Sequence, residues 1–307
     1  MRKTLGINIS HHCSFAYFED GVLKEYYEED RFNKIKHYSP EDDESGIYTY
    51  QYQVLKKFKN ITFDAVVVAT CDRGHIQIEL PIIKHILEQI KFKEYYFNTV
   101  NHHIYHATCG YFFSKFDKAI ALTSDGGGEI EVAKNFKTLQ SIFLIDKKEV
   151  VPKYKYYSNK KTDYFNNFVP TEIHEKKDID YTISNKAKAG LKYLYYLVDA
   201  GFGEGEEGQL MGLAAYKGKK TNLDSNLLNI ADEAQKETLK DVIELIERAK
   251  EYSDCKNIIL SGGYHLNCSN NFKLVKLYPE YNFFVDPIPY DGGTAVGAVY
   301  YYENYYR

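Results

Sequence analysis

Two histidines at helical spacing are the residues in this sequence that are best placed to do chemistry. His102 and His106 stand at positions i and i+4 of the segment 101–106, which reads NHHIYH. If this segment begins a helix, both imidazoles project from one face, the arrangement that places two nitrogen ligands on one metal ion. The alternative is a pair of polar histidines at a helix start, bonded to solvent or backbone. His103 points elsewhere on the helix and is a weaker candidate ligand.

A glycine-rich segment follows a predicted apolar strand and carries a second candidate site. Asp125 is followed directly by Gly126, Gly127 and Gly128. Consecutive glycines let backbone amides approach a phosphate group, and a carboxylate at the end of the strand can hold a cation beside it. A hairpin turn is the alternative interpretation of the same residues.

Two further turns have the composition of ligand-binding turns. Gly262, Gly263 and Asn267 lie between a predicted strand and a predicted helix, a unit that directs helix amides toward an anion. The segment matches neither the P-loop nor the dinucleotide-binding pattern, and a plain tight turn is the alternative. Asp291 precedes the last predicted helix, where it either caps that helix or completes a metal site.

The elements that must position these residues are alternating strands and helices. Asp20-Gly21 predicts a hairpin between Phe15–Phe18 and Val22–Tyr27. Residues 147–180 are rich in Lys and Tyr without a clear period, which indicates an exposed excursion between two halves. The charged segment Glu28–His37 is typical of a solvated face, and Gly205–Tyr216 of a loop entering a helix. The other predicted strands are Thr4–Ile9, Phe63–Thr70, Tyr95–Val100, Lys118–Thr123, Asn257–Leu260 and Tyr281–Val285, and the predicted helices are Tyr48–Phe58, Pro81–Ile90, Ile104–Phe113, Lys186–Ala200, Lys236–Tyr252, a segment ending near Leu277 and one beginning at Thr294.

Composition excludes several classes of protein. The 307 residues carry a net charge of −4, which does not favour a non-specific nucleic-acid binder. Thirty Tyr and 18 Phe are too many for a disordered chain, and no apolar run approaches the length of a membrane span. Five scattered cysteines without a signal peptide indicate reduced thiols and a cytoplasmic location.

Taken in order, these segments resemble the carbamoyltransferases of the nodulation and antibiotic-tailoring type. The matching segments run from residue 5 to about residue 300: Leu5–Ser14, Glu28–His37, Val100–Ala107, Asp125–Glu129, Glu207–Tyr216, Leu260–Asn267 and Asp291–Ala298. The resemblance implies an α/β, actin/hexokinase-like ATPase fold with two ribonuclease-H-like halves around a central cleft. We expect residues 1–146 as the first half, 147–185 as the polar excursion and 186–307 as the second half.

The resemblance also assigns residues to roles. His102, His106, Asp125 and Asp291 match iron-binding positions, and His12 and His37 match histidines that line the carbamoyl-transfer pocket. Gly262, Gly263 and Asn267 match a nucleotide-contacting turn, with Gly126–Gly128 near the phosphates. A divalent cation beside a phosphate anhydride neutralises leaving-group charge, and a nearby imidazole takes the proton of an attacking alcohol.

The implied activity is O-carbamoyl transfer from carbamoyl-adenylate, made from carbamoyl phosphate and ATP, to an acceptor hydroxyl. The acceptor is a sugar or natural product, or a hydroxymethylated pyrimidine of nucleotide or DNA. Alternatives are N-carbamoylation of a tRNA adenosine, as in related enzymes, and a non-catalytic nucleotide-binding scaffold.

The sequence departs from the family pattern in three ways. Cys13 stands where the family usually has Asp, and Gln209 where it usually has Lys. No segment corresponds to the family's adenylate-forming C-terminal domain, so we expect the donor to come from a separate adenylate-forming protein.

Overall fold

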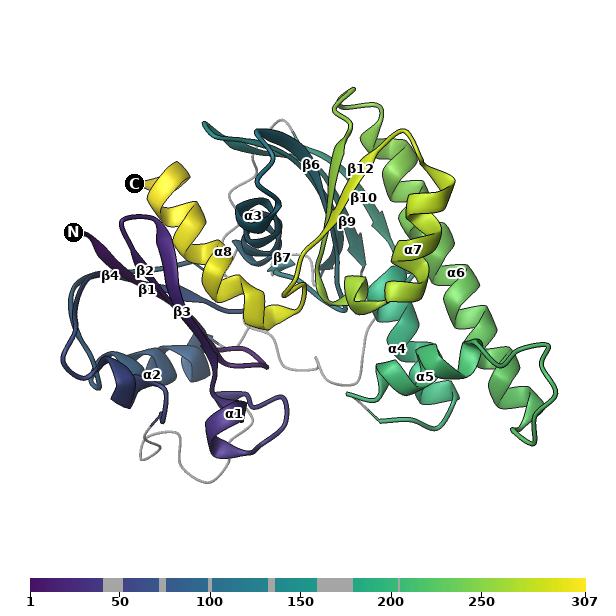
Figure 1. Ribbon diagram of the computed structural model, residues 1–307, viewed down its shortest axis with the longest axis horizontal. Coiled ribbons are helices and arrows are strands. Elements are labelled where there is room, and N and C mark those ends of the chain that lie inside the picture. The colour runs from purple at the N-terminus through teal and green to yellow at the C-terminus, as the bar shows by residue number, and fades with distance from the viewer. Residues whose placement is uncertain (41–51, 72–75, 99–100, 132–135, 159–178, 204) are drawn as a thin grey trace.

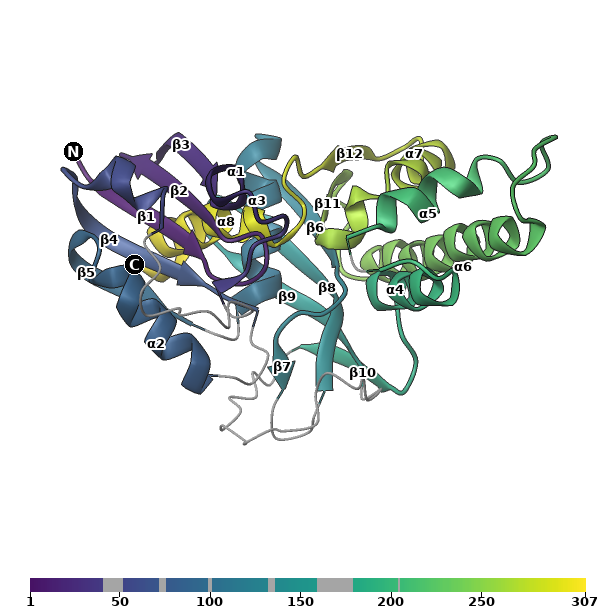
Figure 2. The same ribbon diagram turned by 90° about the horizontal axis from the view of Figure 1, so that it is seen from below.

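The computed structural model describes residues 1–40, 52–71, 76–98, 101–131, 136–158, 179–203 and 205–307, which form two sheets with helices between and around them (Figures 1 and 2). The first sheet has the order β3 (Val22–Glu28), β2 (Ser14–Glu19), β1 (Lys3–Asn8), β4 (Thr62–Ala69), β5 (Lys91–Phe97). The β1 strand is antiparallel to β2 and parallel to β4, because a hairpin turn at Asp20-Gly21 reverses the chain after β2.

The second sheet contains strands from the middle and the end of the chain. Its order is β10 (Asp180–Ser184), β9 (Val150–Ser158), β8 (Phe136–Asp146), β6 (Lys118–Ser124), β11 (Asn257–Ser261), β12 (Asn282–Val285), and β7 (Ile130–Glu131) pairs with β8. Both β6 and β11 are parallel neighbours whose central residues are fully buried, as expected of a sheet covered on both faces.

Two helices pack between the sheets and bring the ends of the sequence together. The α3 helix (His102–Ser114) contacts β6 and β11, and α8 (Thr294–Tyr301) contacts β1, β2 and β4 (Figure 1). Figure 1 also shows α7 (Cys268–Leu277) and α6 (Ser225–Ala249) beyond the second sheet, with α4 (Ala189–Asp199) and α5 (Glu207–Ala214) below them. The remaining helices are α1 (Asp30–Asn33), α2 (Ile76–Leu87), the short η2 (Leu55–Phe58), η6 (Gly263–Leu266) and η7 (Asp291–Gly293), and the π-helix η8 (Tyr302–Tyr306). Within the described ranges, no helix combines the length and apolar character that crossing a membrane requires.

The contact between α3 and α8 depends on glycine. A Cβ at Gly297 would lie 1.8 Å from the Tyr105 carbonyl oxygen, and Thr108 Oγ1 donates to the Gly297 carbonyl at 2.8 Å. We therefore expect Gly297→Ala to lower the free energy of unfolding by about 1–3 kcal/mol, measured by urea denaturation, because the backbones must separate. Gly212→Ala on α5 is the matched control, since no atom lies within 4 Å of its added Cβ. Equal stability of Gly297→Ala and the control would contradict this packing.

The division of the chain differs from the expected boundary at residue 146. Strands on both sides of that residue, β6 and β8 before it and β11 and β12 after it, share the second sheet, while α8 packs on the first. Within the expected excursion, β9 and β10 are strands, and Tyr154, Tyr156 and Ser158 alternate into the core. This alternation escapes a hydropathy pattern because Lys and Tyr side chains cover apolar surface with their stems and rings. Residues 159–178, and residues 48–51 of one expected helix, lie outside the described residues.

Candidate metal centre and surrounding cleft

Four side chains from distant parts of the sequence converge at the inner end of α3. His102, His106, Asp125 and Asp291 are all buried, and one ligand atom from each lies within 4.8 Å of the other three. The two histidines come from the first turns of α3, Asp125 follows the end of β6, and Asp291 begins η7. The structure thus brings together all four residues that the sequence predicted as metal ligands.

The distances within this cluster fit a single cation. The Nε2 atoms of His102 and His106 lie 3.1 Å apart, about the spacing of two neighbouring ligands that are each ~2.1 Å from one ion. Asp291 Oδ1 is 3.5 Å from both of these nitrogens, and Asp125 Oδ2 is 3.4 Å from His102 Nε2. The Nδ1 atoms of both rings are buried and have no partner in the described part of the chain, so the polar contacts of each ring lie inside the cluster.

The electrostatics of the cluster also favour a cation. Burial opposes a charged His102, yet the Cys71 thiol and the Asp291 and Asp125 carboxylates hold the pKa of this imidazole well above its ordinary value. Burial likewise opposes ionised carboxylates, but His11 and His102 hold the pKa of Asp291 well below its usual range. Two imidazoles and two carboxylates are a donor set that zinc, iron and manganese all accept. The residues present therefore fit a divalent transition metal.

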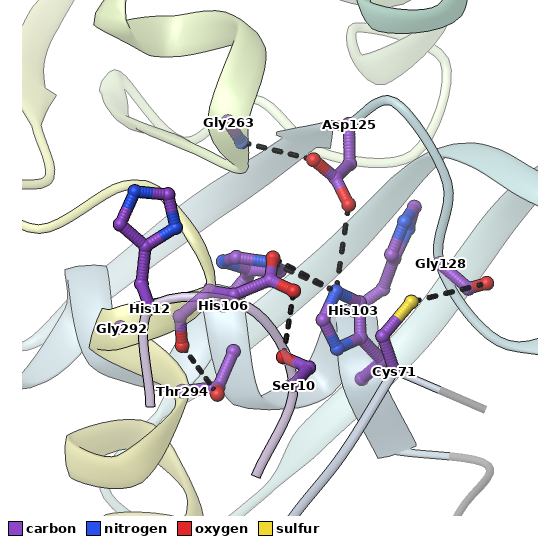
Figure 3. Close-up of polar contacts among 12 residues, drawn as sticks. Ser10, His12, Cys71, His103, His106, Asp125, Gly128, Gly263, Gly292 and Thr294 are labelled. Carbon is purple, nitrogen blue, oxygen red and sulfur yellow. Dashed lines mark hydrogen bonds and ion pairs between the residues drawn. The ribbon is translucent and has the colours of Figure 1, made fainter. Parts of the chain in front are cut away.

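Asp291 is oriented by its neighbours rather than used as a helix cap. Its Oδ2 atom accepts a hydrogen bond from Ser10 Oγ at 2.8 Å and lies 3.3 Å from His11 Nε2, which leaves Oδ1 toward the two histidines (Figure 3). No side-chain cap is made at the start of η7 or of α8. Ser10 and His11 were missed by the sequence analysis, although the adjacent histidines at the end of β1 were a usable signal.

The glycine segment after Asp125 is partly the hairpin that was the alternative interpretation. It leads from β6 into β7 and β8, which are antiparallel partners, and Gly128 N donates to Thr138 O at 2.7 Å. Cys71 Sγ donates to the Gly127 carbonyl at 3.0 Å (Figure 3 draws the longer contact of this thiol with Gly128). An added Cβ would collide with Lys137 at Gly127 and with His103 at Gly128, while Gly126 faces Leu194 at 3.2 Å. These glycines are required by close packing, and their contact with phosphate stays a prediction.

His103 serves this segment and not the metal cluster. Its ring is fully buried, its Nδ1 lies 2.7 Å from Ser141 Oγ, and its backbone N–H donates to Glu129 Oε2 at 3.1 Å. Burial opposes the charge on Glu129, but an ion pair with Lys155 lowers the pKa of this carboxyl to about 2. A carboxylate at the start of α3 is stabilised by the helix dipole, so Glu129 helps to hold the helix that carries the metal ligands.

The second glycine turn is joined directly to the cluster. Gly262 has a φ of +91°, and an added Cβ would lie 2.4 Å from the Ser124 carbonyl oxygen. Gly263 N donates to Asp125 Oδ1 at 3.1 Å (Figure 3). The Asn267 side chain caps α7 by accepting from Asn270 N and donates to Gln235 Oε1 at 3.0 Å. Asn267 therefore has a structural role, and its contact with nucleotide stays a prediction.

The two remaining predicted residues lie together beside the cluster. His12 Nε2 and His37 Nδ1 are 2.5 Å apart, and the His12 ring also contacts the ring of Tyr290. Burial and the neighbouring imidazoles of His11 and His37 lower the pKa of His12 to about 3, and burial with the Lys36 charge lowers the pKa of His37. Both rings are therefore neutral near pH 7 and able to accept a proton.

Comparison with known proteins supports the resemblance found in the sequence. Residues 214–300 match the family model described as "Carbamoyltransferase N-terminus". The Nodulation protein NolNO of Sinorhizobium fredii (strain NBRC 101917 / NGR234) is 23% identical over 344 residues, covering 93% of this chain and 45% of that protein. The chain thus spans about half the length of this curated relative.

Solved structures confirm the fold class. A full-length HypF in its phosphate- and nucleotide-bound form has a TM-score of 0.60 at 14% identity, over 99% of this chain and 56% of that one. A ROK family glucokinase from Streptomyces griseus in complex with glucose and AMPPNP has a TM-score of 0.52 at 11% identity, over 97% of this chain and 98% of that one. The chain has the actin/hexokinase-like α/β fold that the motifs predicted, and its resemblance to the carbamoyltransferases is confirmed.

Proposed function

We propose that this carbamoyltransferase-family enzyme transfers a carbamoyl group from carbamoyl-adenylate to the hydroxyl group of an acceptor. In this reaction the acceptor O–H bond breaks, a new O–C bond forms to the carbamoyl carbon, and the bond from that carbon to the phosphate oxygen breaks. AMP leaves with the electron pair. The observation that carries the proposal is the buried His102, His106, Asp125, Asp291 cluster, which lies between a glycine turn and a pair of neutral histidines.

The nucleotide part of the donor is assigned to the turn at Gly262-Gly263. The similar HypF structure was solved with phosphate and nucleotide bound, which supports a nucleotide site in the shared fold. In this chain the turn reaches Asp125 through the Gly263 amide, so a phosphate at the turn lies near the metal ligands. This proximity supports our assignment of the turn to the leaving AMP.

The cluster is assigned to a divalent metal, for which the resemblance implies iron. A metal ion bound there supplies positive charge for the phosphate and the polarised carbamoyl group. Ser10 and His11 orient Asp291 toward the site, and Gly263 orients Asp125. His12 and His37 are the groups that accept the proton of the acceptor hydroxyl.

A substitution in the glycine turn tests the nucleotide assignment. Gly263 leaves 3.0 Å between its missing Cβ position and Asp125 Oδ1, so Gly263→Val places a branched side chain in the approach to this carboxylate. We expect the affinity for AMP to fall at least ~10-fold, measured by calorimetry, which corresponds to about 1.4 kcal/mol. Gly208→Val, on α5 where nothing lies within 4 Å, is the control. Unchanged AMP affinity in Gly263→Val would remove this turn from the site.

The proposed reaction is tested by mass spectrometry of candidate acceptors. The chain is incubated with carbamoyl phosphate, ATP and an adenylate-forming domain from a two-domain relative, so that the outcome does not depend on where the donor is made. Sugars, natural products and hydroxymethylated pyrimidine nucleotides are offered separately. We expect one of these hydroxyl compounds to gain the mass of a carbamoyl group, and only when the chain is present. Carbamoylation of a tRNA adenosine with no modified hydroxyl compound would contradict the proposal.

A further inference from the structure

Three imidazoles form an unbroken row that begins at Asp291. His11 Nε2 lies 3.3 Å from Asp291 Oδ2, and His11 Nδ1 lies 2.8 Å from His12 Nδ1. His12 Nε2 in turn lies 2.5 Å from His37 Nδ1. Each of the three rings therefore uses a different nitrogen toward each neighbour.

The backbone holds this row in place at some energetic cost. His12 and His37 have φ values of +61° and +58°, in the left-handed region that non-glycine residues rarely adopt. The adjacent Cys13 N–H donates to the Tyr38 carbonyl at 2.9 Å, which ties the two segments together. Strained conformations of this kind persist where the surrounding structure imposes them, commonly at functional sites.

The carboxylate at one end sets the direction of every hydrogen bond in the row. An ionised Asp291 only accepts hydrogen bonds, so His11 carries its proton on Nε2 and its Nδ1 is an acceptor. His12 must then donate from Nδ1, which leaves Nε2 as an acceptor for a proton on His37 Nδ1. The last nitrogen, His37 Nε2, is left with a free lone pair.

We infer that His11 is a positioning residue that selects the tautomers of His12 and His37, so that His37 Nε2 is the atom that takes the proton of the acceptor hydroxyl. This inference rests on the proposed carbamoyl transfer and assigns the base within it. The acceptor oxygen forms its bond to the carbamoyl carbon, AMP departs with the electrons of the broken C–O bond, and the hydroxyl proton moves to His37 Nε2.

The surroundings of His37 support this assignment. Its Nε2 atom has no hydrogen-bond partner among the described residues. Gly205 lies against it with a φ of +84°, and a Cβ added there would be 2.8 Å from Nε2, so only a glycine leaves that side of the ring without a side chain. Burial lowers the pKa of both His12 and His37, which keeps the two rings in neutral, single-tautomer forms near pH 7.

The tautomers are measured directly by nitrogen NMR of the full chain labelled with 15N-histidine. In the wild type we expect His37 and His12 to be protonated at Nδ1 and His11 at Nε2. In His11→Phe the row loses its link to Asp291, and His37 Nε2 is expected to change from an unprotonated to a protonated nitrogen. His11 is 35% exposed, so these substitutions leave the core unchanged. A wild-type His37 protonated at Nε2 would overturn the inference, whether or not any acceptor is carbamoylated.

Two conservative variants separate the two contacts of His11. The amide of asparagine reaches the position of histidine Nδ1, so His11→Asn restores an acceptor for His12. The amide of glutamine reaches the position of Nε2, so His11→Gln restores a donor for Asp291. We expect His11→Phe to lower the transfer kcat about 100-fold, and expect recovery in His11→Asn and not in His11→Gln.

Metal affinity should show the opposite pattern, because it depends on the orientation of Asp291. Titration with Mn²⁺ as the probe is expected to show affinity ~10-fold weaker in His11→Asn than in His11→Gln. Equal behaviour of the two variants in both measurements would overturn the inference. If the wild type carbamoylates no acceptor, the proposed function fails, while the NMR and Mn²⁺ results still decide the role of His11.

Discussion

Replacing His106 by alanine is expected to reduce the bound divalent metal from about one ion per chain to a small fraction of that content. The variant loses one of two imidazole ligands and leaves the buried Asp291 and Asp125 carboxylates facing each other across the cluster. Elemental analysis of protein purified and dialysed in parallel measures the change. Because the four donors act on one ion, Asp291→Asn is expected to show a similar loss.

The control for metal loss is His85→Ala, which removes a histidine from α2, outside the cluster. We expect this variant to keep the metal content of the wild type. Equal metal content in His106→Ala and the wild type would show that the cluster is not the metal site. The paired imidazoles would then be polar core residues, which was the alternative interpretation of their spacing.

Replacing His37 by alanine is expected to lower the kcat of carbamoyl transfer by at least ~100-fold while leaving metal content and AMP affinity unchanged. The substitution removes an imidazole that contacts His12 and keeps the metal ligands and the Gly262-Gly263 turn intact. Steady-state kinetics at saturating donor measure the effect. Ile35→Ala, an exposed side chain of the same segment, is the matched control. A kcat that falls equally in both variants would mean that the segment, and not the His37 ring, matters.

The pH dependence of transfer follows from the same rings. A base must be neutral, and burial with the adjacent His11 and His37 rings lowers the pKa of His12 to about 3, while the pKa of His37 is also lowered. The transfer rate is therefore expected to persist as the pH falls through ~6.5, where an ordinary histidine becomes protonated and inactive as a base. A rate that halves near that pH would indicate a solvent-exposed imidazole as the base.

The metal cluster and the fold were predictable from the sequence because both depend on local patterns. The spacing of His102 and His106 fixes their common face once the helix forms, and the glycine turns after apolar strands mark the ends of adjacent strands in the second sheet. The resemblance supplied the long-range step, which was that Asp125 and Asp291 meet the histidines. Spacing alone left this open, because residues 125 and 291 are joined only through the sheet and α8.

Other features depend on tertiary contacts that no sequence pattern records. Ser10 and His11 orient Asp291 across 281 and 280 positions of sequence, and the row from His11 to His37 forms only when two loops meet. The strands β8 to β10 were missed because their Lys and Tyr residues read as polar, although alternate side chains are buried. Asn267 shows the opposite case, since a residue expected at nucleotide is engaged in a helix cap.

The central claim is that this chain itself carries out the transfer step, and a single-turnover reaction with preformed carbamoyl-adenylate tests it most directly. The purified chain, loaded with metal, is mixed with the donor and with an acceptor identified by mass spectrometry, and the products are quantified over time. We predict that carbamoylated acceptor and AMP appear together in equal amounts, and that both are lost in His106→Ala. Release of AMP at the same rate without carbamoylated acceptor, or no consumption of the donor beyond its spontaneous hydrolysis, would contradict the account.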